Sequence, residues 1–478
     1  MIEHVVILGG GACGMSAALV LARRGVRVTV LECEPRAGGL CGTQERDGFR
    51  FDLGGHRFLP RSAATAALVR DVLGEELLVR TRSSVVMHRG ERYLYPLELD
   101  DVVRRFGVRR GVRAVASYAG ERLRQRAFPS ADRSFEDWVV HRFGRELYDA
   151  FFGPYTEKLW GLPPSEISAD WAAQRISLPS LGDVLMRLVG ARRGTPPRTY
   201  ARRYLYPRLG IGQIFERMSE VVRGLGGTIL LGERAIALGH AKGKVSRVTV
   251  EDREGRQREL ACDAVLSTLA LPSVARMLGP LSPRVARSSS NLRFRGIRLL
   301  NVMLDRPRVT PHTWMYVSEP RYLAARIQEP RHRSPAAAPE GKTSLMMEIP
   351  CAVGDDVWRA PREQIYERCM DDLASLGIPD LGDLRRDTLG SFDSFVEQGY
   401  PIYHLDYRSD RARTLEHVGR FANLVTCGRQ GAFRYVFMDT AMEMGMRAAA
   451  VLLDGGDRLA PAELGSEQGL IEAKALTA

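Results

Sequence analysis

The sequence predicts an α/β fold in which one parallel sheet is assembled from separated parts of the chain. Residues 4–8 (HVVIL) are an apolar strand, a glycine-rich turn and a helix over 14–23 follow, and 26–31 are a second apolar strand. Further apolar runs at 263–268 and 421–427 are typical of buried strands that return to the same sheet. We therefore expect the segments between these strands to be insertions into a discontinuous domain.

The turn after the first strand has the spacing of a dinucleotide-binding site. Gly9, Gly11 and Gly14 form a G-x-G-x-x-G motif between strand and helix, and Glu32 ends the second strand. Gly9 allows the tight turn, Gly11 lets the backbone approach a pyrophosphate, and Gly14 lets the helix pack closely on the strand. The N–H groups that open the helix then face the anion. A carboxylate at Glu32 would accept hydrogen bonds from a ribose hydroxyl and repel a 2′-phosphate.

The composition limits the class of protein. The chain has 478 residues, about three domains by length, and 45% of them are apolar. No window approaches the run of about twenty uncharged apolar residues that a membrane span needs, and we expect no signal peptide. The seven cysteines include no C-x-x-C pair, so we expect reduced thiols in a cytoplasmic protein. The nine histidines show no zinc-binding spacing, so we expect no metal.

The formal net charge of +12 comes almost wholly from arginine. Nucleic-acid binding is one interpretation, but the arginines are spread along the chain without a basic-aromatic repeat. A GC-rich genome that favours arginine codons explains the composition equally well. A third interpretation is that some arginines line a pocket for an anionic substrate. We therefore expect a small-molecule substrate and no nucleic acid, and leave the oligomeric state open, a homodimer being one possibility.

The remaining segments have weaker patterns. Residues 62–77 are expected to be helical, 84–95 alternate like a hairpin, and 97–200 are helical and rich in arginine. Residues 296–304 and 343–350 alternate in sheet fashion, while the tail from 456 is expected to be mobile. These patterns predict a helical insertion and a sheet-containing insertion.

Four stretches of the chain resemble one known superfamily. The glycine turn continues into 36–43 (RAGGLCGT), and three further segments are 55–58 (GHRF), 155–161 (YTEKLWG) and 428–439 (GRQGAFRYVFMD). They are similar to segments of flavoproteins related to UDP-galactopyranose mutase, within the wider amine oxidase and protoporphyrinogen oxidase group. The resemblance spans the chain from end to end and implies a Rossmann-like domain that binds FAD.

The resemblance and the strand pattern divide the chain into six segments. The FAD-binding domain is expected in three parts, interrupted by a mainly helical substrate or cap segment and by an antiparallel sheet substrate domain. The predicted limits are 1–83, 204–290 and 409–455 for the three parts, 84–203 for the helical segment, 291–408 for the sheet domain and 456–478 for the tail.

The resemblance also implies which residues contact FAD. His56 follows two glycines, so its imidazole is expected over the isoalloxazine, with a hydrogen-bonded core histidine as the alternative. Asp439, at a helix start, is expected to cap that helix and to hold the ribityl hydroxyls. The cofactor-binding residues implied are Gly9, Gly11, Cys13, Gly14, Glu32, Arg36, Gly39, Leu40, Gly55, His56, Gly428 and Asp439.

Arg429 and Tyr435 matter most for the substrate class. In the mutases the matching arginine and tyrosine hold the diphosphate of the nucleotide sugar. A guanidinium suits this role because its planar fork binds phosphate oxygens bidentately and keeps its charge. Arg326, in 326–329 (RIQE), resembles the second arginine of that clamp. The alternative for each arginine is a surface salt bridge.

Three further aromatic residues have matches in the substrate site of the mutases. Trp160 would stack on the nucleotide base from a mobile segment, with an ordinary core tryptophan as the alternative. Tyr204 and Tyr403 match substrate tyrosines less closely.

Two enzyme classes fit these residues, with His56 and Arg429 as the catalytic candidates. In the first, FAD accepts a hydride from a sugar-like, nucleotide- or phosphate-linked substrate, and His56 accepts the proton. In the second, reduced flavin attacks a nucleotide sugar. The sugar ring then opens and recloses at a different size, without net redox change. The mutase segment G-A-H-x-F-H is altered here to 55–60 (GHRFLP), which favours the oxidoreductase. A flavin-bearing sensor protein would not explain the clamp.

Overall fold

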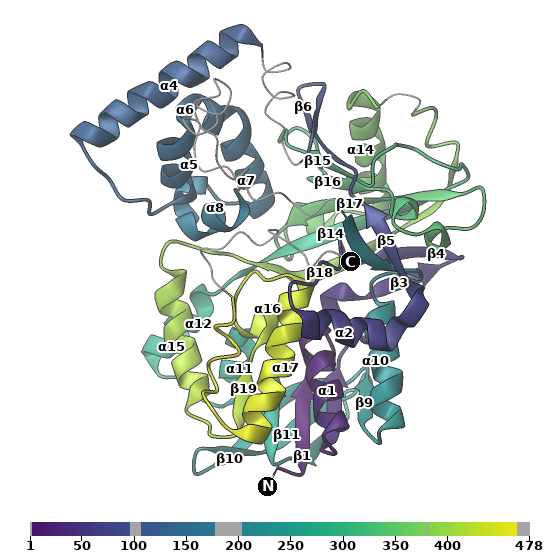
Figure 1. Ribbon diagram of the computed structural model, residues 1–478, viewed down its shortest axis with the longest axis vertical. Coiled ribbons are helices and arrows are strands. Elements are labelled where there is room, and N and C mark those ends of the chain that lie inside the picture. The colour runs from purple at the N-terminus through teal and green to yellow at the C-terminus, as the bar shows by residue number, and fades with distance from the viewer. Residues whose placement is uncertain (1, 96–106, 177–202, 379–380, 466–478) are drawn as a thin grey trace.

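The computed structural model describes residues 2–95, 107–176, 203–378 and 381–465. A five-stranded parallel sheet with the order β19-β13-β1-β2-β9 forms the centre of the lower half in Figure 1. Its strands come from three separated regions of the chain, so the predicted discontinuous α/β fold is confirmed. They are β1 (His4–Leu8), β2 (Arg27–Glu32), β9 (Thr228–Leu231), β13 (Ala264–Ser267) and β19 (Leu424–Thr426).

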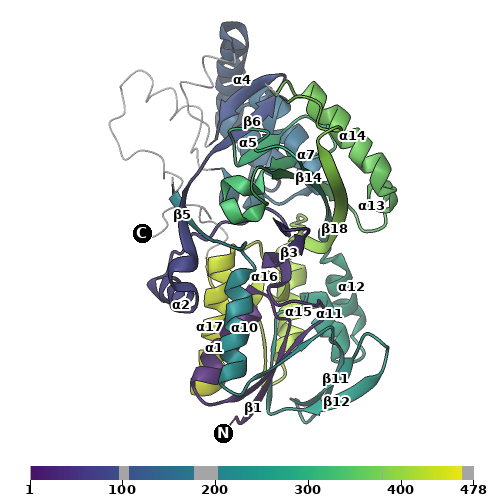
Figure 2. The same cartoon turned by 90° about the vertical axis from the view of Figure 1, so that its right-hand side faces the viewer.

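Two helices pack against α1 (Ala12–Arg23) beside the parallel sheet (Figures 1 and 2): α10 (Gln213–Gly224) and α17 (Met438–Asp454). A Cβ on Gly445 of α17 would lie 2.0 Å from the carbonyl oxygen of Cys13 in α1. Only glycine therefore allows these two helices to come this close. Further helices of this half are α2 (Ala63–Leu73), α11 (Leu271–Met277), α12 (Pro283–Asn291), α15 (Tyr407–Gly419) and α16 (Gly428–Gly431).

The helix expected over 62–77 is shorter than the pattern predicts. Gly74 has a φ of 54°, which ends α2, and the chain continues as strand β5 (Leu77–Thr81). Strand β5 pairs with β8 (Arg203–Pro207), more than 120 residues further along the chain. The other small sheets are the hairpin of β3 (Thr43–Arg46) and β4 (Phe49–Asp52), and the three strands β10 (Arg234–Ala241), β11 (Lys244–Glu251) and β12 (Gln257–Ala261).

A seven-stranded sheet with the order β18-β14-β17-β16-β15-β6-β7 lies in the upper half of Figure 1. Its neighbours are antiparallel except for β15 and β6, which are parallel. The expected hairpin over 84–95 is its edge, formed by β6 and β7. The strands are β6 (Ser84–His88), β7 (Glu91–Leu94), β14 (Phe294–Leu304), β15 (Trp314–Val317), β16 (Arg326–Gln328), β17 (Thr343–Cys351) and β18 (Thr388–Pro401).

The two faces of this sheet differ in chemistry. Met315, Ile327 and Met347 lie on one face and pack in an apolar core with side chains of α14 (Arg362–Ser375), which follows the short helix α13 (Asp356–Arg359). The residues next to them along each strand point the other way, because strand side chains alternate. The register pairs Tyr316 with Arg326 and Arg326 with Glu348, so this polar row crosses three strands on the second face.

A group of helices covers the upper left of Figure 1. Helix α5 begins with a capping box in which Ser134 Oγ accepts from the Asp137 backbone N–H and the Asp137 carboxylate accepts from the Ser134 backbone N–H. Residues 97–106 and 177–200 of the predicted helical insertion lie outside the described residues. The helices are α4 (Val108–Ala127), α5 (Phe135–Phe143), α6 (Arg145–Leu147), α7 (Gly153–Trp160) and α8 (Ala169–Arg175).

The described part of the tail, 456–465, is packed rather than mobile. Arg434 Nη1 donates to the carbonyl oxygens of Ala462 (3.1 Å) and Leu464 (2.8 Å), and Ala462 is fully buried. The expectation of a mobile tail is therefore wrong for these residues, because a buried arginine far away in the sequence holds their backbone. Residues 466–478 lie outside the described part.

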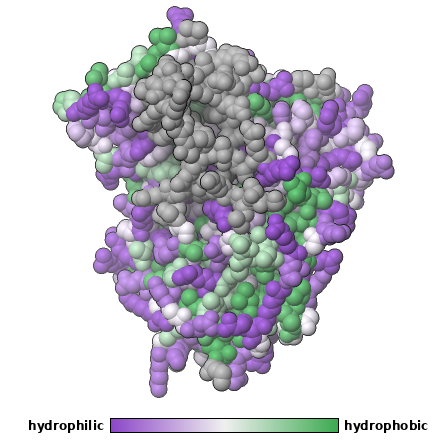
Figure 3. Space-filling model, in the orientation of Figure 1, coloured by the Kyte–Doolittle hydropathy of each residue, from purple (hydrophilic) through white to green (hydrophobic). Residues whose placement is uncertain are grey.

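Hydrophilic side chains cover most of the described surface visible in Figure 3, with hydrophobic ones interspersed. Among the helices that the structure describes, none is long and apolar enough to cross a membrane.

Lys158 in α7 links the helical group to the seven-stranded sheet and its following loop by hydrogen bonds. Its Nζ donates to the backbone carbonyl oxygens of Val317 (3.0 Å), Glu319 (3.0 Å) and Ala324 (2.8 Å). Burial lowers the pKa of Lys158 to about 7. Replacing Lys158 by methionine leaves three carbonyl groups without this donor, and each such loss costs about 1–3 kcal/mol.

We expect Lys158→Met to lower the free energy of unfolding by about 3 kcal/mol, measured by urea denaturation. The exposed Lys244→Met serves as the control and should change it by less than about 0.5 kcal/mol. The unfolded lysine has a pKa of about 10.4, so between pH 7 and 10 the unfolded chain binds more protons than the folded one. The contribution of Lys158 to the free energy of unfolding should therefore increase with pH in this window. An equal loss of stability in Lys158→Met and Lys244→Met would contradict the stabilising role of Lys158.

Candidate functional site

A cavity of about 600 Å³ lies between the parallel sheet and the seven-stranded sheet. At one end it is lined by the glycine turn after β1 and by the carboxyl end of β2. At the other end it is lined by residues of β15, β16, β17 and β18, while Gly428 of α16 lines it close to Cys13. Its volume is in the range of about 300–1,000 Å³ that is usual for ligand and cofactor sites.

The first glycine turn has the backbone geometry that its spacing predicts. Gly9 has a φ of 98°, in the left-handed region that favours glycine. A Cβ on Gly14 would lie 2.0 Å from the carbonyl oxygen of Gly9, so Gly14 lets α1 pack directly on the turn. A Cβ on Gly39 would lie 3.1 Å from the Cα of Gly11, which brings the second glycine turn against the first. The N-cap of α1 is Gly11, and no side chain caps the helix, so its first N–H groups are available to an anion at the cavity.

Glu32 borders the cavity at the end of β2 and is held in place by two backbone groups. Its Oε2 accepts from the N–H of Gly10 (2.8 Å) and its Oε1 from the N–H of Glu34 (2.9 Å). Burial raises the pKa of Glu32, and these hydrogen bonds oppose the shift. A fixed carboxylate with remaining lone pairs suits ribose hydroxyl donors.

Nine of the twelve predicted cofactor residues line the cavity, and three do not. Gly14 packs α1 on the turn, and Arg36 Nη1 donates to the carbonyl oxygen of Thr43 (3.0 Å). Asp439 Oδ2 accepts from Arg61 Nε (2.7 Å), and the N-cap of α17 is Phe437, so the expected cap by Asp439 is not formed. The nine are Gly9, Gly11, Cys13, Glu32, Gly39, Leu40, Gly55, His56 and Gly428.

The structure shows why position 55 is a glycine, which the sequence did not reveal. A Cβ on Gly55 would lie 1.8 Å from Cη2 of Trp314, so the absence of a side chain makes room for the indole. Trp314 itself lines the cavity, and its Nε1 is buried without a hydrogen-bond partner among the described residues. The guanidinium of Arg57 lies 4.9 Å from the indole centroid.

His56 lines the cavity beside Trp314. Its Nδ1 is buried and has no hydrogen-bond partner in the part of the chain that the structure describes. Burial lowers the pKa of His56, and Arg333 and Arg429 lower it further, while Asp52 opposes the shift. The imidazole is therefore neutral at pH 7 and able to accept a proton.

Arg326 and Arg429 both line the cavity, but their electrostatic surroundings differ. Arg326 Nη1 donates to Glu348 Oε1 (2.5 Å) and to Tyr400 Oη (2.6 Å), so its charge is already compensated. Arg429 Nε and Nη2 are buried without hydrogen-bond partners among the described residues. Its guanidinium lies 4.2 Å from the ring centroid of Tyr435 and 5.0 Å from that of Tyr400. Arg429 is thus a half-buried cation that aromatic rings position, with two buried guanidinium nitrogens that have no hydrogen-bond partner among the described residues.

Arg175 is a cavity residue that the sequence analysis missed. Its guanidinium lies 5.0 Å from the ring centroid of Tyr435, so that ring has both Arg175 and Arg429 beside it. Arg175 ends α8, and no motif surrounds it. Only the pairing of distant segments brings it to Tyr435, so no local signal would have identified it.

Three predicted substrate residues do not border the cavity. Trp160 is 1% exposed and packs edge-on against Trp171 and Tyr400. It therefore lies in the core, which fits the alternative of an ordinary core tryptophan. Tyr204 is buried in β8. Tyr403 accepts a hydrogen bond at Oη from the backbone N–H of Tyr435 (2.7 Å), so it positions a cavity residue.

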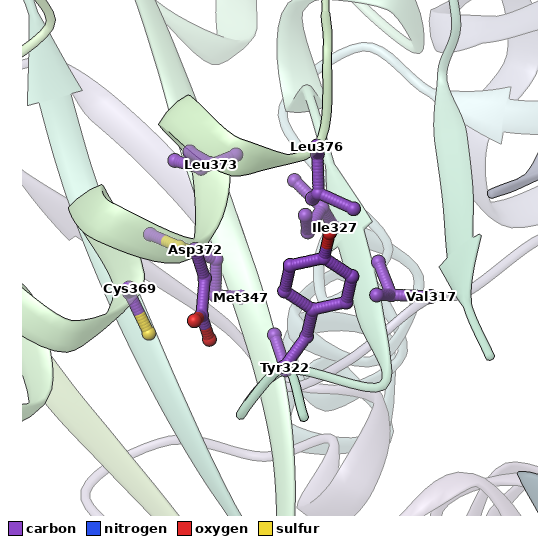
Figure 4. A pocket seen from close by; sticks show the side chains of 9 residues that line it. Val317, Tyr322, Ile327, Met347, Cys369, Asp372, Leu373 and Leu376 are labelled. Carbon is purple, nitrogen blue, oxygen red and sulfur yellow. The ribbon is translucent and has the colours of Figure 1, made fainter. Parts of the chain in front are cut away.

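A second hollow, of about 10 Å³, lies beneath α14 on the other face of the seven-stranded sheet (Figure 4). It has room for about one water molecule. Apart from Asp372, which accepts from the backbone N–H of Leu323 (2.6 Å), its lining is predominantly apolar. It is too small for a substrate. Within the described ranges there is also no cluster of three or more His, Cys, Asp or Glu side chains that could hold a metal ion.

The chain belongs to the flavin-containing amine oxidoreductase family, whose sequence model matches residues 12–453. It is similar to a phytoene dehydrogenase of Streptomyces griseus, with 25% identity over 447 residues, 80% of each chain. It is also similar to a coproporphyrinogen III oxidase of Bacillus subtilis (strain 168), with 33% identity over 101 residues, 20% of this chain and 22% of that one.

Solved structures share the fold. A reduced UDP-galactopyranose mutase has a TM-score of 0.82 at 21% identity, covering 98% of this chain and 99% of the other. A putative protoporphyrinogen oxidase from Exiguobacterium sp. 255-15 has a TM-score of 0.69 at 19% identity, covering 95% and 99%. The family and the glycine turns together identify FAD as the cofactor. Glu32 would hold its ribose and the start of α1 its pyrophosphate.

Proposed function

We propose that the protein is an FAD-dependent oxidoreductase that removes a hydride from a sugar-like substrate carrying a nucleotide or phosphate group. The observation that carries the proposal is the half-buried guanidinium of Arg429, whose buried Nε and Nη2 have no hydrogen-bond partner within the described ranges, in the same cavity as the FAD-binding glycine turns. When bound, FAD supplies the hydride acceptor.

Arg429 suits the charged part of such a substrate. Buried donors without acceptors are unfavourable in the free protein, so a ligand anion that accepts from Arg429 Nε and Nη2 would remove this cost. Two opposite charges 4 Å apart attract by about 4 kcal/mol at an effective dielectric constant of 20, against about 1 kcal/mol in water. The guanidinium of Arg175 also lies beside the ring of Tyr435, and its positive charge would add to the attraction for the anion.

His56 would accept the proton that leaves the substrate hydroxyl as the hydride departs. A base must be neutral to act, and burial lowers the pKa of His56 from its ordinary value of about 6.5. We therefore expect the rate of flavin reduction to fall to half only below about pH 6.5. In His56→Gln, stopped-flow measurements should show a slower rate without this acidic decline. An unchanged decline would assign it to another group.

The alternative is a mutase that isomerises a nucleotide sugar with reduced FAD and without net redox change. Arg429 and Tyr435 in one cavity support it equally, because they match the diphosphate-binding pair of the mutases. The altered segment after Gly55 and the compensated charge of Arg326 favour the oxidoreductase. A cytoplasmic location remains a prediction of the sequence.

One anaerobic experiment separates the two functions. The oxidised holoprotein is mixed with UDP-galactopyranose, UDP-glucose and their sugar phosphates, and absorbance is followed at about 450 nm, the usual flavin band. The chemically reduced holoprotein is incubated with the same compounds, and the products are separated by chromatography. Substrate-dependent bleaching is the result that we expect. Furanose formation by the reduced form alone would establish the mutase, and no response to any of these compounds would reject both functions.

A further inference from the structure

Helix α4 (Val108–Ala127) packs by one face against described residues of α5 and α6. Ala114 is buried, and Ser117 Oγ accepts from the backbone N–H of Glu146 (3.2 Å). Glu121, four residues on, lies 3.7 Å from His141 of α5. Residues at this spacing share one side of a helix, so this side faces α5 and α6. Figure 1 shows α4 at the edge of the molecule, far from the parallel sheet.

The opposite side of α4 carries exposed apolar side chains. Val112 and Leu123 are each 64% exposed, and Val115 is 40% exposed. At 100° per residue, Val112 and Leu123 lie within about 20° of each other around the axis, and about 180° from Glu121. Phe128, directly after the helix, is 74% exposed. The apolar stripe of α4 therefore points away from the part of the protein that the structure describes, the reverse of a surface helix that covers a core.

Four of the arginines of α4 (109, 113, 122 and 126) lie beside this stripe, within about 100° of Val112 around the helix axis. The helix has six of them and a single acidic residue, Glu121, which is bound to Arg124 (2.7 Å) on the packed side. An apolar stripe flanked by arginines is the pattern of helices that lie in the interface of an anionic lipid bilayer. The six are Arg109, Arg110, Arg113, Arg122, Arg124 and Arg126.

We propose that α4, with Phe128, binds the surface of an anionic lipid bilayer. The apolar side chains would enter the headgroup region, and the arginines would pair with lipid phosphates. A helix of 20 residues is about 30 Å long and would lie in the plane of the membrane. Nucleic acid would use the arginines but leave the apolar stripe in water. A second copy bound face to face would place arginines opposite arginines, because a two-fold interface repeats the same surface.

The test uses the full-length holoprotein and sedimentation with extruded vesicles. One set contains phosphatidylcholine alone, and the other contains phosphatidylcholine mixed with phosphatidylglycerol. We expect binding to the anionic vesicles, weaker binding to the neutral ones, and loss of binding in 1 M salt, where the screening length is about 3 Å. Each arginine at the surface contributes about fivefold to the affinity, so Arg113→Glu with Arg122→Glu should weaken binding at least 25-fold.

The variant Val112→Glu/Leu123→Glu tests the apolar stripe while changing only exposed positions. It should bind anionic vesicles at least tenfold more weakly, because each buried leucine or valine contributes more than that factor. Leu225→Glu, at a position 49% exposed beyond the end of α10, is the matched control and should bind like the wild type.

Equal binding to neutral and anionic vesicles, or equal binding by the stripe variant and the control, would overturn the proposal. Sedimentation velocity without vesicles adds a further check. A wild-type dimer that the stripe variant converts to a monomer would assign the same face to a second copy of the chain, and would also overturn it.

Discussion

Replacement of Gly14 by alanine should abolish FAD binding. The added Cβ would lie 2.0 Å from the carbonyl oxygen of Gly9 and 3.2 Å from its carbonyl carbon, and both are backbone atoms that cannot move aside. Helix α1 would have to withdraw from the turn, which moves its first N–H groups away from the position of the pyrophosphate. We expect at least a 100-fold loss of affinity for FAD, measured as flavin released from the purified protein and by reconstitution with added FAD.

The matched control is Gly224→Ala, in α10, where a Cβ would meet no atom within 4 Å. It should retain FAD fully and be as stable or slightly more stable, since alanine favours a helix by about 1 kcal/mol over glycine. Far-UV circular dichroism distinguishes loss of cofactor from loss of fold in Gly14→Ala. A Gly14→Ala protein with a full complement of FAD would contradict the role of this turn.

Replacement of Arg429 by methionine should separate ligand binding from stability. Two hydrogen bonds from a charged donor contribute about 1.5–3 kcal/mol each, so affinity for a phosphate-bearing ligand such as UDP should fall by 100-fold or more. The free protein should be as stable as the wild type or more so, because two buried guanidinium nitrogens without acceptors among the described residues are removed. Calorimetric titration with UDP and thermal unfolding measure the two effects.

Two controls sharpen this prediction. Arg429→Lys keeps the charge but not the planar fork, and should recover part of the affinity. Arg217→Met, on the exposed side of α10, should change neither quantity. If Arg429→Met bound UDP as tightly as the wild type, the anion would bind elsewhere, and the proposed substrate class would lose its main support.

The sequence predicts the parallel sheet because its signals are local. An apolar strand, a glycine turn and a helix within the first 31 residues suffice to predict the site of the cofactor, and the returning strands are short apolar runs. The left-handed φ of Gly9 and the contact of Gly14 with the Gly9 carbonyl also depend on backbone geometry within a few residues. Such features need no knowledge of the rest of the chain.

Other parts of the site depend on contacts between distant segments. Gly55 is needed by Trp314, about 260 residues away, and Arg175 reaches Tyr435 only through the packing of α8. From the sequence, Arg326 and Arg429 have the same predicted role of binding phosphate. The register of β16 and β17, however, places Glu348 directly beside Arg326. A sequence motif does not show which of two arginines is already neutralised.

A crystal structure of the holoprotein would test most directly whether the cofactor and Arg429 share one cavity. We expect the FAD pyrophosphate at the start of α1, its ribose at Glu32, and the flavin ring in the part of the cavity bordered by His56, Trp314 and Arg429. A flavin ring bound away from these three side chains, with Arg429 facing bulk solvent, would contradict the account.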